Sequence, residues 1–482
     1  MNEQNPLPSP FPDAAPRAPL APRGRARAPI AVGGVPRERP FGMAGKLLVA
    51  LWIAVTFDPQ WFFASHGLRP ILKIPTLMLL WLIALLIMEV PSRTEWKKRW
   101  EWNWPFLTFV LTGLVMTPFA QNNGIARAAL TLYMIYWTLM VASIVIVDSA
   151  RRTEKLFLVY GFSFFWWGLW GAWRGGVPWH YGLFNEDGFG ALMVTGIGVA
   201  AFFTAAAPKG SQFRKVMLYT TIMAIIGVVA SFARGAFLSA VVVGFMIWVR
   251  SKHKMKAAML GAVGAVLVVI AANVLHKGAF WAEIQSAFTE GTREGTGNDR
   301  AILWTAAWEV FKENPVFGVA PRNFGPFAAS YFNVGDLPEG GYGYTHNPRM
   351  LYNRSLHNIY FQILCEQGIA GALAFLWILV DFWKRNMRLR KPEAQRRWNL
   401  LGGTLEVRSL ALGLEAGMVG FLLPGMFYGL MPMHWFYTLL ALNLLLHARV
   451  YGKGVPASVR AAPKRKARFA RAAVPAATPG PA

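Results

Sequence analysis

Residues 257–275 read AAMLGAVGAVLVVIAANVL, and residues 358–380 read NIYFQILCEQGIAGALAFLWILV. Each run is long and apolar enough to form a transmembrane helix, which needs roughly 20 mostly apolar residues. Between them lies a polar segment, 276–357, that is rich in Arg, Gly and Pro. This alternation predicts two membrane-spanning helices joined by one large loop outside the bilayer.

The rest of the chain has the composition of a multi-span membrane protein. Of its 482 residues, 55% are hydrophobic and only 15% are charged. The net charge of +25 would suit a nucleic-acid partner, but the basic residues lie mainly in short loops between apolar runs and in the two tails. We therefore expect a phospholipid bilayer, and no nucleic acid, as the partner. The single cysteine, Cys365, rules out a disulfide framework and a cysteine metal site.

The whole sequence predicts an all-α integral membrane protein with about 12 transmembrane helices and one large, partly helical periplasmic loop. The apolar segments are approximately 44–57, 70–90, 104–120, 125–147, 156–173, 188–207, 216–232, 235–249, 257–275, 358–380, 408–427 and 431–447. The domains that follow are a disordered basic tail at 1–43, helices at 44–275, the loop at 276–357, helices at 358–447 and a second basic tail at 448–482.

Lys and Arg are distributed asymmetrically over the predicted loops. Alternate loops, together with both tails, collect most of them, whereas the opposite short loops and span ends hold only Arg69, Lys73, Arg127, Arg174 and Arg234. The positive-inside rule then places both termini on the cytoplasmic side and the loop 276–357 on the outer face of the membrane.

Arg234 stands against this orientation bias, because it lies at the outer junction of two apolar runs, in Ser231–Gly235. A guanidinium near hydrocarbon is costly unless it is paired or faces a wet cavity, so it is a functional candidate. Its planar fork matches phosphate oxygens, and the amides of a helix that begins after Gly235 would add to an anion site. The alternative is an arginine that reaches the lipid headgroups.

Arg300 begins a second motif, 300–311, in which apolar residues recur at helical spacing. The pattern predicts an amphipathic helix that starts near Arg300, is capped by the Asn-Asp pair at 298–299 and stops at the Asn-Pro pair at 314–315. The alternative role of Arg300 is a surface ion pair with a nearby acidic residue of the loop.

His357 lies at the outer lip of the apolar run 358–380. A neutral imidazole at this position can accept a proton from a sugar hydroxyl. Arg349 and Arg354 would favour the neutral form if they lie close in space. His346 is a weaker candidate of the same kind. The alternative is a helix-capping or interfacial histidine.

Several familiar signatures are absent from the sequence. It contains no phosphate-binding Gly-Lys-Ser/Thr loop, no HExxH motif and no nucleophile elbow. The outer-face carboxylates form no cluster typical of a divalent-metal site, so we expect neither a metal nor a cofactor. Asp58 stands alone in the first outer loop, and Asp187 is expected to cap a helix that begins near Gly188.

The stretch SLHNIYFQILCEQGIAG, residues 355–371, resembles the signature of the O-antigen ligase and polymerase superfamily. There, a His-Asn pair is followed by an apolar turn, an acidic-x-Gly step and small residues. Upstream, the segment from Arg300 to Gly318 and the triplet 322–324 resemble the loop that precedes this signature, and Ser231–Gly235 resembles the outer-face arginine motif of the family. The resemblance covers residues 190–390, and the flanking spans agree in topology.

The resemblance implies a metal-independent glycosyltransferase of the bacterial inner membrane, whose large loop and active face lie in the periplasm. Carried over to this chain, Arg234 and Arg300 would hold the diphosphate of an undecaprenyl-diphosphate-linked glycan donor, and His357 would activate the acceptor hydroxyl. Four further basic residues of the loop are expected to assist substrate binding; they are Arg322, His346, Arg349 and Arg354. The lack of a candidate nucleophile predicts direct attack with inversion at the anomeric carbon.

The sequence does not identify the acceptor that receives the glycan. The first hypothesis is a ligase that transfers the glycan to a lipid A-core acceptor. The same donor and arginines would serve a polymerase that joins lipid-linked repeat units, or a protein O-oligosaccharyltransferase. A lipid or polysaccharide transporter is a hypothesis of another class, but no internal repeat of the kind typical of transporters is evident.

Overall fold

The computed structural model describes residues 42–57, 103–174, 186–276, 295–339, 343–429 and 433–452, with isolated positions at 80, 83, 281, 282, 285, 431 and 459. All of them belong to one compact unit, Pro40–Ala482. Every regular element in these ranges is helical, which confirms the predicted all-α class. Asp58 and most of both predicted tails and of the predicted span 70–90 lie outside the described residues. The predicted start of the second tail at 448 is too early, because α18 continues to Tyr451.

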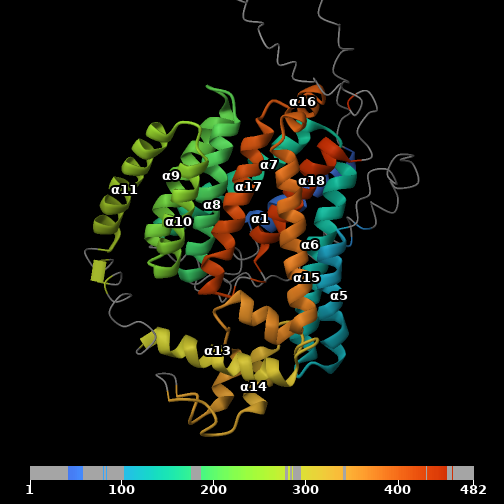
Figure 1. Ribbon diagram of the computed structural model, residues 1–482, viewed down its shortest axis with the longest axis vertical. Helices are drawn as coiled ribbons and strands as arrows, with labels where there is room; N and C mark the ends of the chain where they lie inside the picture. The colour runs from blue at the N-terminus through green and yellow to red at the C-terminus, as the bar shows by residue number, and fades with distance from the viewer. Residues whose placement is uncertain are drawn as a thin grey trace, which may run out of the picture. The chain divides into compact units, whose positions relative to one another are not determined.

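Figure 1 shows the helices in colours that follow the order of the chain. The α-helices are α1 Met43–Phe57, α5 Trp104–Met116, α6 Asn123–Ile146, α7 Ala150–Trp173, α8 Glu186–Ala206, α9 Gln212–Ala230, α10 Arg234–Arg250, α11 Lys254–His276, α13 Gly295–Glu313, α14 Phe324–Tyr331, α15 Ile359–Leu389, α16 Pro392–Leu400, α17 Val407–Leu422 and α18 His434–Tyr451. Three 3₁₀ turns join them: η2 Thr117–Phe119, η3 Pro348–Asn353 and η4 Pro424–Met426.

Each predicted span within the described ranges coincides with a helix. Among the described residues, seven helices are long and apolar enough to cross a membrane: α6, α7, α8, α9, α11, α15 and α17 with its 3₁₀ extension. The helices α1 and α5 are apolar but shorter. The chain therefore has several helices able to span a bilayer, and the count of 12 remains a prediction.

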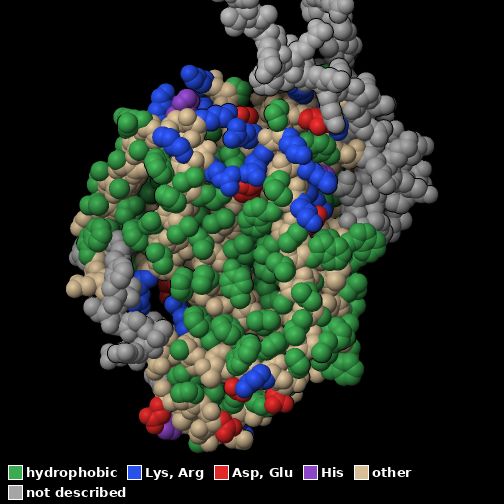
Figure 2. Space-filling model, in the orientation of Figure 1, with side chains coloured by type: hydrophobic (Ala, Val, Ile, Leu, Met, Phe, Trp, Pro, Cys, Tyr) green, Lys and Arg blue, Asp and Glu red, His purple; other side chains and the backbone are tan. Residues whose placement is uncertain are grey.

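The core of the bundle surrounds α18. Every residue from His434 to Val450 is buried, because α18 packs against α6, α7, α15 and α17. At the periphery, α11 packs on α9 and α10 and is otherwise largely exposed. Figure 2 shows a broad apolar band along the helices, with Lys and Arg side chains gathered at the end that carries α16. This is the charge asymmetry on which the predicted orientation depends.

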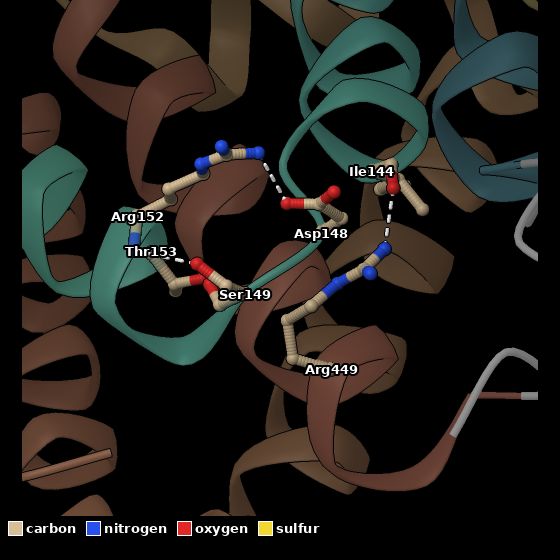
Figure 3. Close-up of polar contacts among 6 residues, drawn as sticks. All are labelled: Ile144, Asp148, Ser149, Arg152, Thr153 and Arg449. Carbon is tan, nitrogen blue, oxygen red and sulfur yellow. Dashed lines mark hydrogen bonds and ion pairs between the residues drawn. The ribbon is translucent and has the colours of Figure 1, made fainter. Parts of the chain in front are cut away.

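The turn between α6 and α7 shows how polar side chains are held in place at the end of the bundle that carries α16 (Figure 3). Ser149 caps α7 by accepting a hydrogen bond from the amide of Arg152 at 3.2 Å. The Arg152 guanidinium pairs with Asp148 at 2.6 Å. The buried Arg449 of α18 donates to the carbonyl oxygen of Ile144, in the last turn of α6. The two buried arginines at this end are thus held by partners, Arg152 by the turn before its own helix and Arg449 by α6.

The polar segment 276–357 forms its own small core beside the bundle. Helices α13 and α14 pack together and against α15, and Figure 1 shows them at the opposite end from α16. The buried face of α13 carries apolar residues at helical spacing: Ile302, Leu303, Ala306, Ala307 and Val310. The amphipathic helix and its stop before the Asn-Pro pair are therefore confirmed, although α13 begins at Gly295, earlier than predicted.

The helix α15 is broken at Gly368, whose φ of 65° lies in the left-handed region. The loop after α13 enters the break: the amide of Ile369 donates to the Pro315 carbonyl at 2.8 Å, and the amide of Val319 donates to the Cys365 carbonyl at 3.0 Å. A Cβ at Gly368 would lie 2.4 Å from the backbone of Val316. The acidic-x-Gly step of the signature is thus the point at which the loop joins the bundle.

We expect Gly368→Ala to destabilise the protein more than Gly210→Ala does. Both glycines have positive φ, which costs an L-residue roughly 1–2 kcal/mol. A Cβ at Gly210 meets nothing within 4 Å, whereas one at Gly368 clashes with backbone and adds about 1–3 kcal/mol. Thermal unfolding of both variants in detergent measures the difference, and equal melting temperatures would contradict the described packing.

Candidate functional site

Arg300 projects from the second turn of α13 and pairs with Asp187 in the first turn of α8. The Arg300 Nη2 atom lies 3.0 Å from Asp187 Oδ2, and both side chains are largely buried. Two expectations are therefore wrong. Arg300 does not lie at the start of a helix capped by residues 298–299, and Asp187 lies inside α8 rather than capping it. The pair links the loop to the bundle across 113 positions of sequence.

Arg234 joins the same cluster from α10. The chain turns at Ser231–Phe232, where Phe232 takes a φ of 58°, and α10 begins at Arg234. Gly190, one turn along α8 from Asp187, packs so closely on Ala236 that a Cβ would lie 2.6 Å from it. The Asp187 carboxylate accordingly interacts electrostatically with Arg234 as well as Arg300. One carboxylate is thus shared by two arginines from separate helices.

His357 occupies a strained turn just before α15. Its φ is 49°, a conformation that costs a residue with a side chain of order 1–3 kcal/mol and persists only where neighbours enforce it. Asn358 does so from one side, since its Oδ1 accepts from the amides of Tyr360 and Phe361. On the other side, the Leu356 carbonyl accepts from Trp304 Nε1 at 3.0 Å. The helix cap is Asn358, so the capping interpretation of His357 is wrong.

The imidazole of His357 is neutral at physiological pH. Burial, followed by the positive charges of Arg300 and Arg354, lowers its pKa to about 4. Its Nδ1 atom is buried and has no hydrogen-bond partner among the described residues. The Arg300 contribution also shows that the histidine and the arginine cluster share one electrostatic environment. The free lone pair of a neutral imidazole can accept a proton, but the burial and the cations that lower its pKa also make it a weaker base than an exposed histidine.

The other predicted binding residues lie in different places. Arg354 is partly buried, with its guanidinium 5.8 Å from the centre of the Tyr344 ring. Arg349 and His346 are exposed on the same loop. Arg322 is also exposed, and it acts electrostatically on Glu366, a buried residue of α15 whose carboxylate accepts from the Arg322 amide. Of these four residues, Arg354 is the one whose charge acts on His357 among the interactions of the described residues.

The sequence did not predict two residues of this site as site residues. Asp187 was assigned a capping role, although a lone acid on the same predicted face as unpaired arginines was a signal for an ion pair. Tyr428 lies after η4, and its ring centre is 5.6 Å from that of His357. Nothing in the local sequence points to it. Within the described ranges, no group of three or more His, Cys, Asp or Glu side chains is placed to hold a metal ion.

Figure 2 shows a recess beside the apolar band, with basic side chains at its edge, between the bundle and the end formed by α13 and α14. The contacts described above place Asp187 and Arg234 at the ends of bundle helices and Arg300 on α13. The candidate site is thus formed where the loop meets the bundle. Its chemistry is that of a cationic anion-binding centre next to a neutral base.

Comparison with known proteins agrees with this location. The O-antigen ligase family model matches residues 219–376, about a third of the chain. The matched segment runs from α9 into α15 and contains Arg234, Arg300 and His357. It confirms the resemblance to the O-antigen ligase and polymerase superfamily. No curated protein matches the chain.

Proposed function

We propose that this chain is a ligase-type glycosyltransferase of the inner membrane. It moves a glycan from undecaprenyl diphosphate to a hydroxyl of a lipid A-core acceptor at the periplasmic face. The family match supports a ligase or polymerase type of activity. The observation that carries the proposal is the joint position of the Arg234–Asp187–Arg300 cluster and the neutral His357 within one electrostatic environment.

The arginine cluster would bind the diphosphate of the donor. Guanidinium groups bind phosphate oxygens through paired, charge-assisted hydrogen bonds. Asp187 holds Arg300 in place before the donor arrives, and the phosphate oxygens then compete with its carboxylate. Because the site is partly buried, each charge interaction is stronger than it would be in water. The lipid tail would remain in the bilayer while the glycan faces the loop.

His357 would act as the general base of a single displacement. The acceptor hydroxyl gives its proton to the imidazole as its oxygen bonds to the anomeric carbon. The bond from that carbon to the diphosphate oxygen breaks, and undecaprenyl diphosphate leaves with the electron pair. The arginines stabilise the negative charge that grows on the leaving group, which is the largest single contribution in many enzymes of this kind. Attack opposite the leaving group inverts the anomeric centre.

The two arginines provide charge neutralisation that a bound metal ion provides in other glycosyltransferases, so we propose a metal-independent reaction. The diphosphate is already a good leaving group, and its departure drives the transfer without a nucleotide. The acceptor must approach from the side of His357, since the opposite side of the anomeric carbon is occupied by the diphosphate.

We expect purified protein in detergent to transfer glycan from an undecaprenyl-diphosphate donor to lipid A-core, and to do so equally well in EDTA. Three acceptors should be offered in parallel: lipid A-core, a second lipid-linked repeat unit and a periplasmic protein. Transfer only to the repeat unit would identify a polymerase, and transfer only to the protein a protein O-oligosaccharyltransferase. Transfer to none, with lipid flipping in liposomes, would contradict the proposal in favour of transport.

A further inference from the structure

The connection between α17 and α18 lies outside the segment matched by the family model, yet it contacts both sides of the candidate site. It comprises η4, Pro424–Met426, and the residues up to Gly429. Its two central residues are aromatic, Phe427 and Tyr428, which we call the aromatic pair. Each member of the pair faces a different part of the site.

On one side, the connection is fixed to the turn that carries His357. Asn358 Nδ2 donates to the Met426 carbonyl at 3.1 Å, and the Tyr360 hydroxyl donates to the Leu422 carbonyl at 3.0 Å. These bonds place the ring of Tyr428 5.6 Å from the imidazole of His357, at an interplanar angle of 53°. Tyr428 is only 8% exposed, so its ring is a fixed wall rather than a mobile side chain.

On the other side, the connection packs on the first turn of α10. A Cβ at Gly235 would lie 2.9 Å from Cδ2 and 3.1 Å from Cγ of Phe427, so the Phe427 ring lies directly on the backbone next to Arg234. A side chain at position 235 would push either the ring or the helix aside. The contact therefore fixes the distance between Phe427 and the start of α10.

We propose that the aromatic pair positions the two halves of the site, with Tyr428 orienting the imidazole of His357 and Phe427 setting the position of Arg234. The inference rests on the proposed function, in which the arginine binds the donor and the histidine activates the acceptor. His357 needs such a wall, because its buried Nδ1 has no hydrogen bond among the described residues to fix the ring. Rotation of the ring or a shift of α10 would separate base and leaving group.

The first test compares four variants of the full chain. Tyr428→Ala removes the wall, Tyr428→Phe keeps it, Phe427→Ala removes the contact with α10, and Met426→Ala changes an exposed neighbour as the control. A misplacement of about 1 Å can cost roughly 10²-fold, so we expect Tyr428→Ala and Phe427→Ala to lower kcat by about 10–100-fold. The KM for the donor should change by less than about twofold in Tyr428→Ala, since the donor-binding arginines are untouched, and should rise in Phe427→Ala, where Arg234 loses its fixed position. Tyr428→Phe and Met426→Ala should match the wild type.

The second test measures the titration of the His357 imidazole and does not depend on transfer activity. Its ring signals are assigned by comparing ¹⁵N-histidine spectra of the wild type and His357→Gln, among the eight histidines of the chain. Loss of the Tyr428 ring would admit water to the imidazole, so the pKa of His357 should rise from about 4 toward its usual value of 6.5 in Tyr428→Ala. It should not move in Met426→Ala.

The third test uses the contact at Gly235. Gly235→Ala should lower kcat in the wild-type background, because the new methyl group displaces Phe427, and should have little further effect in the Phe427→Ala background. Additive losses would overturn the role of Phe427.

An unchanged His357 titration in Tyr428→Ala, or an equal loss in Tyr428→Phe, would overturn the role of Tyr428. If the wild type transfers no glycan, the proposed function fails, while the titration still decides whether Tyr428 orients His357.

Discussion

Replacing His357 with alanine should lower the rate of glycan transfer by about 10²–10⁴-fold, the usual contribution of a general base. Donor binding should be unchanged, because the diphosphate is held by the arginines. His253→Ala is a suitable control, since His253 is an exposed histidine in the connection between α10 and α11. Transfer at the wild-type rate by His357→Ala would show that His357 is not the general base.

The pH dependence of transfer by the wild type gives an independent signature of the same residue. The base is active when neutral, so kcat/KM should fall as the pH drops through the pKa of His357 in the free enzyme. Burial and the neighbouring arginines lower that pKa to about 4, so the acid limb should lie near pH 4. An acid limb near pH 6.5 would show a base in ordinary contact with water.

Replacing Arg300 with alanine should lower transfer by about 10²–10³-fold, the usual effect of removing one group that stabilises transition-state charge. Affinity for undecaprenyl diphosphate should fall too, because the diphosphate loses one of its two guanidinium groups and Asp187 loses its ion pair in a partly buried site. Arg300→Lys should recover only part of the loss, since an ammonium group cannot reproduce the planar fork.

The matched control for Arg300 lies on the same helix. Lys312 forms an exposed ion pair with Glu309, and such pairs contribute little, so Lys312→Ala should behave as the wild type. Asp187→Asn should weaken the preorganisation of Arg300 while leaving both arginines able to bind phosphate. A smaller loss than that of Arg300→Ala is therefore expected. An equal or greater loss would mean that Asp187 takes a direct part in the reaction.

The local features of the fold were accessible from sequence, and the long-range ones were not. Apolar runs such as 257–275 mark helices because their length and composition suffice, and the break at 231–235 is visible as a short polar interruption. The break of α15 at Gly368 follows the short polar step Glu366-Gln367, which does not by itself predict a break. The break exists because the loop after α13 supplies and accepts backbone hydrogen bonds there.

The candidate site shows the same division. Arg234 stands out as a charged residue between two apolar runs, whereas Arg300 and His357 stand out by their places in motifs that resemble those of the O-antigen ligase superfamily. Their partners could not be predicted in this way, because Asp187 is 113 positions from Arg300 and Tyr428 follows a different helix from His357. The exposure of Arg349 and His346 likewise depends on how the loop folds on itself, which local sequence does not determine.

The most direct test of the account measures donor binding and glycan transfer side by side, with undecaprenyl-diphosphate-linked glycan and purified wild type, Arg300→Ala and His357→Ala. We expect Arg300→Ala to lose both donor binding and glycan transfer. We expect His357→Ala to bind the donor normally and to transfer almost none of the glycan. Transfer by both variants at the wild-type rate would contradict the assignment of the site at the junction of the loop and the bundle.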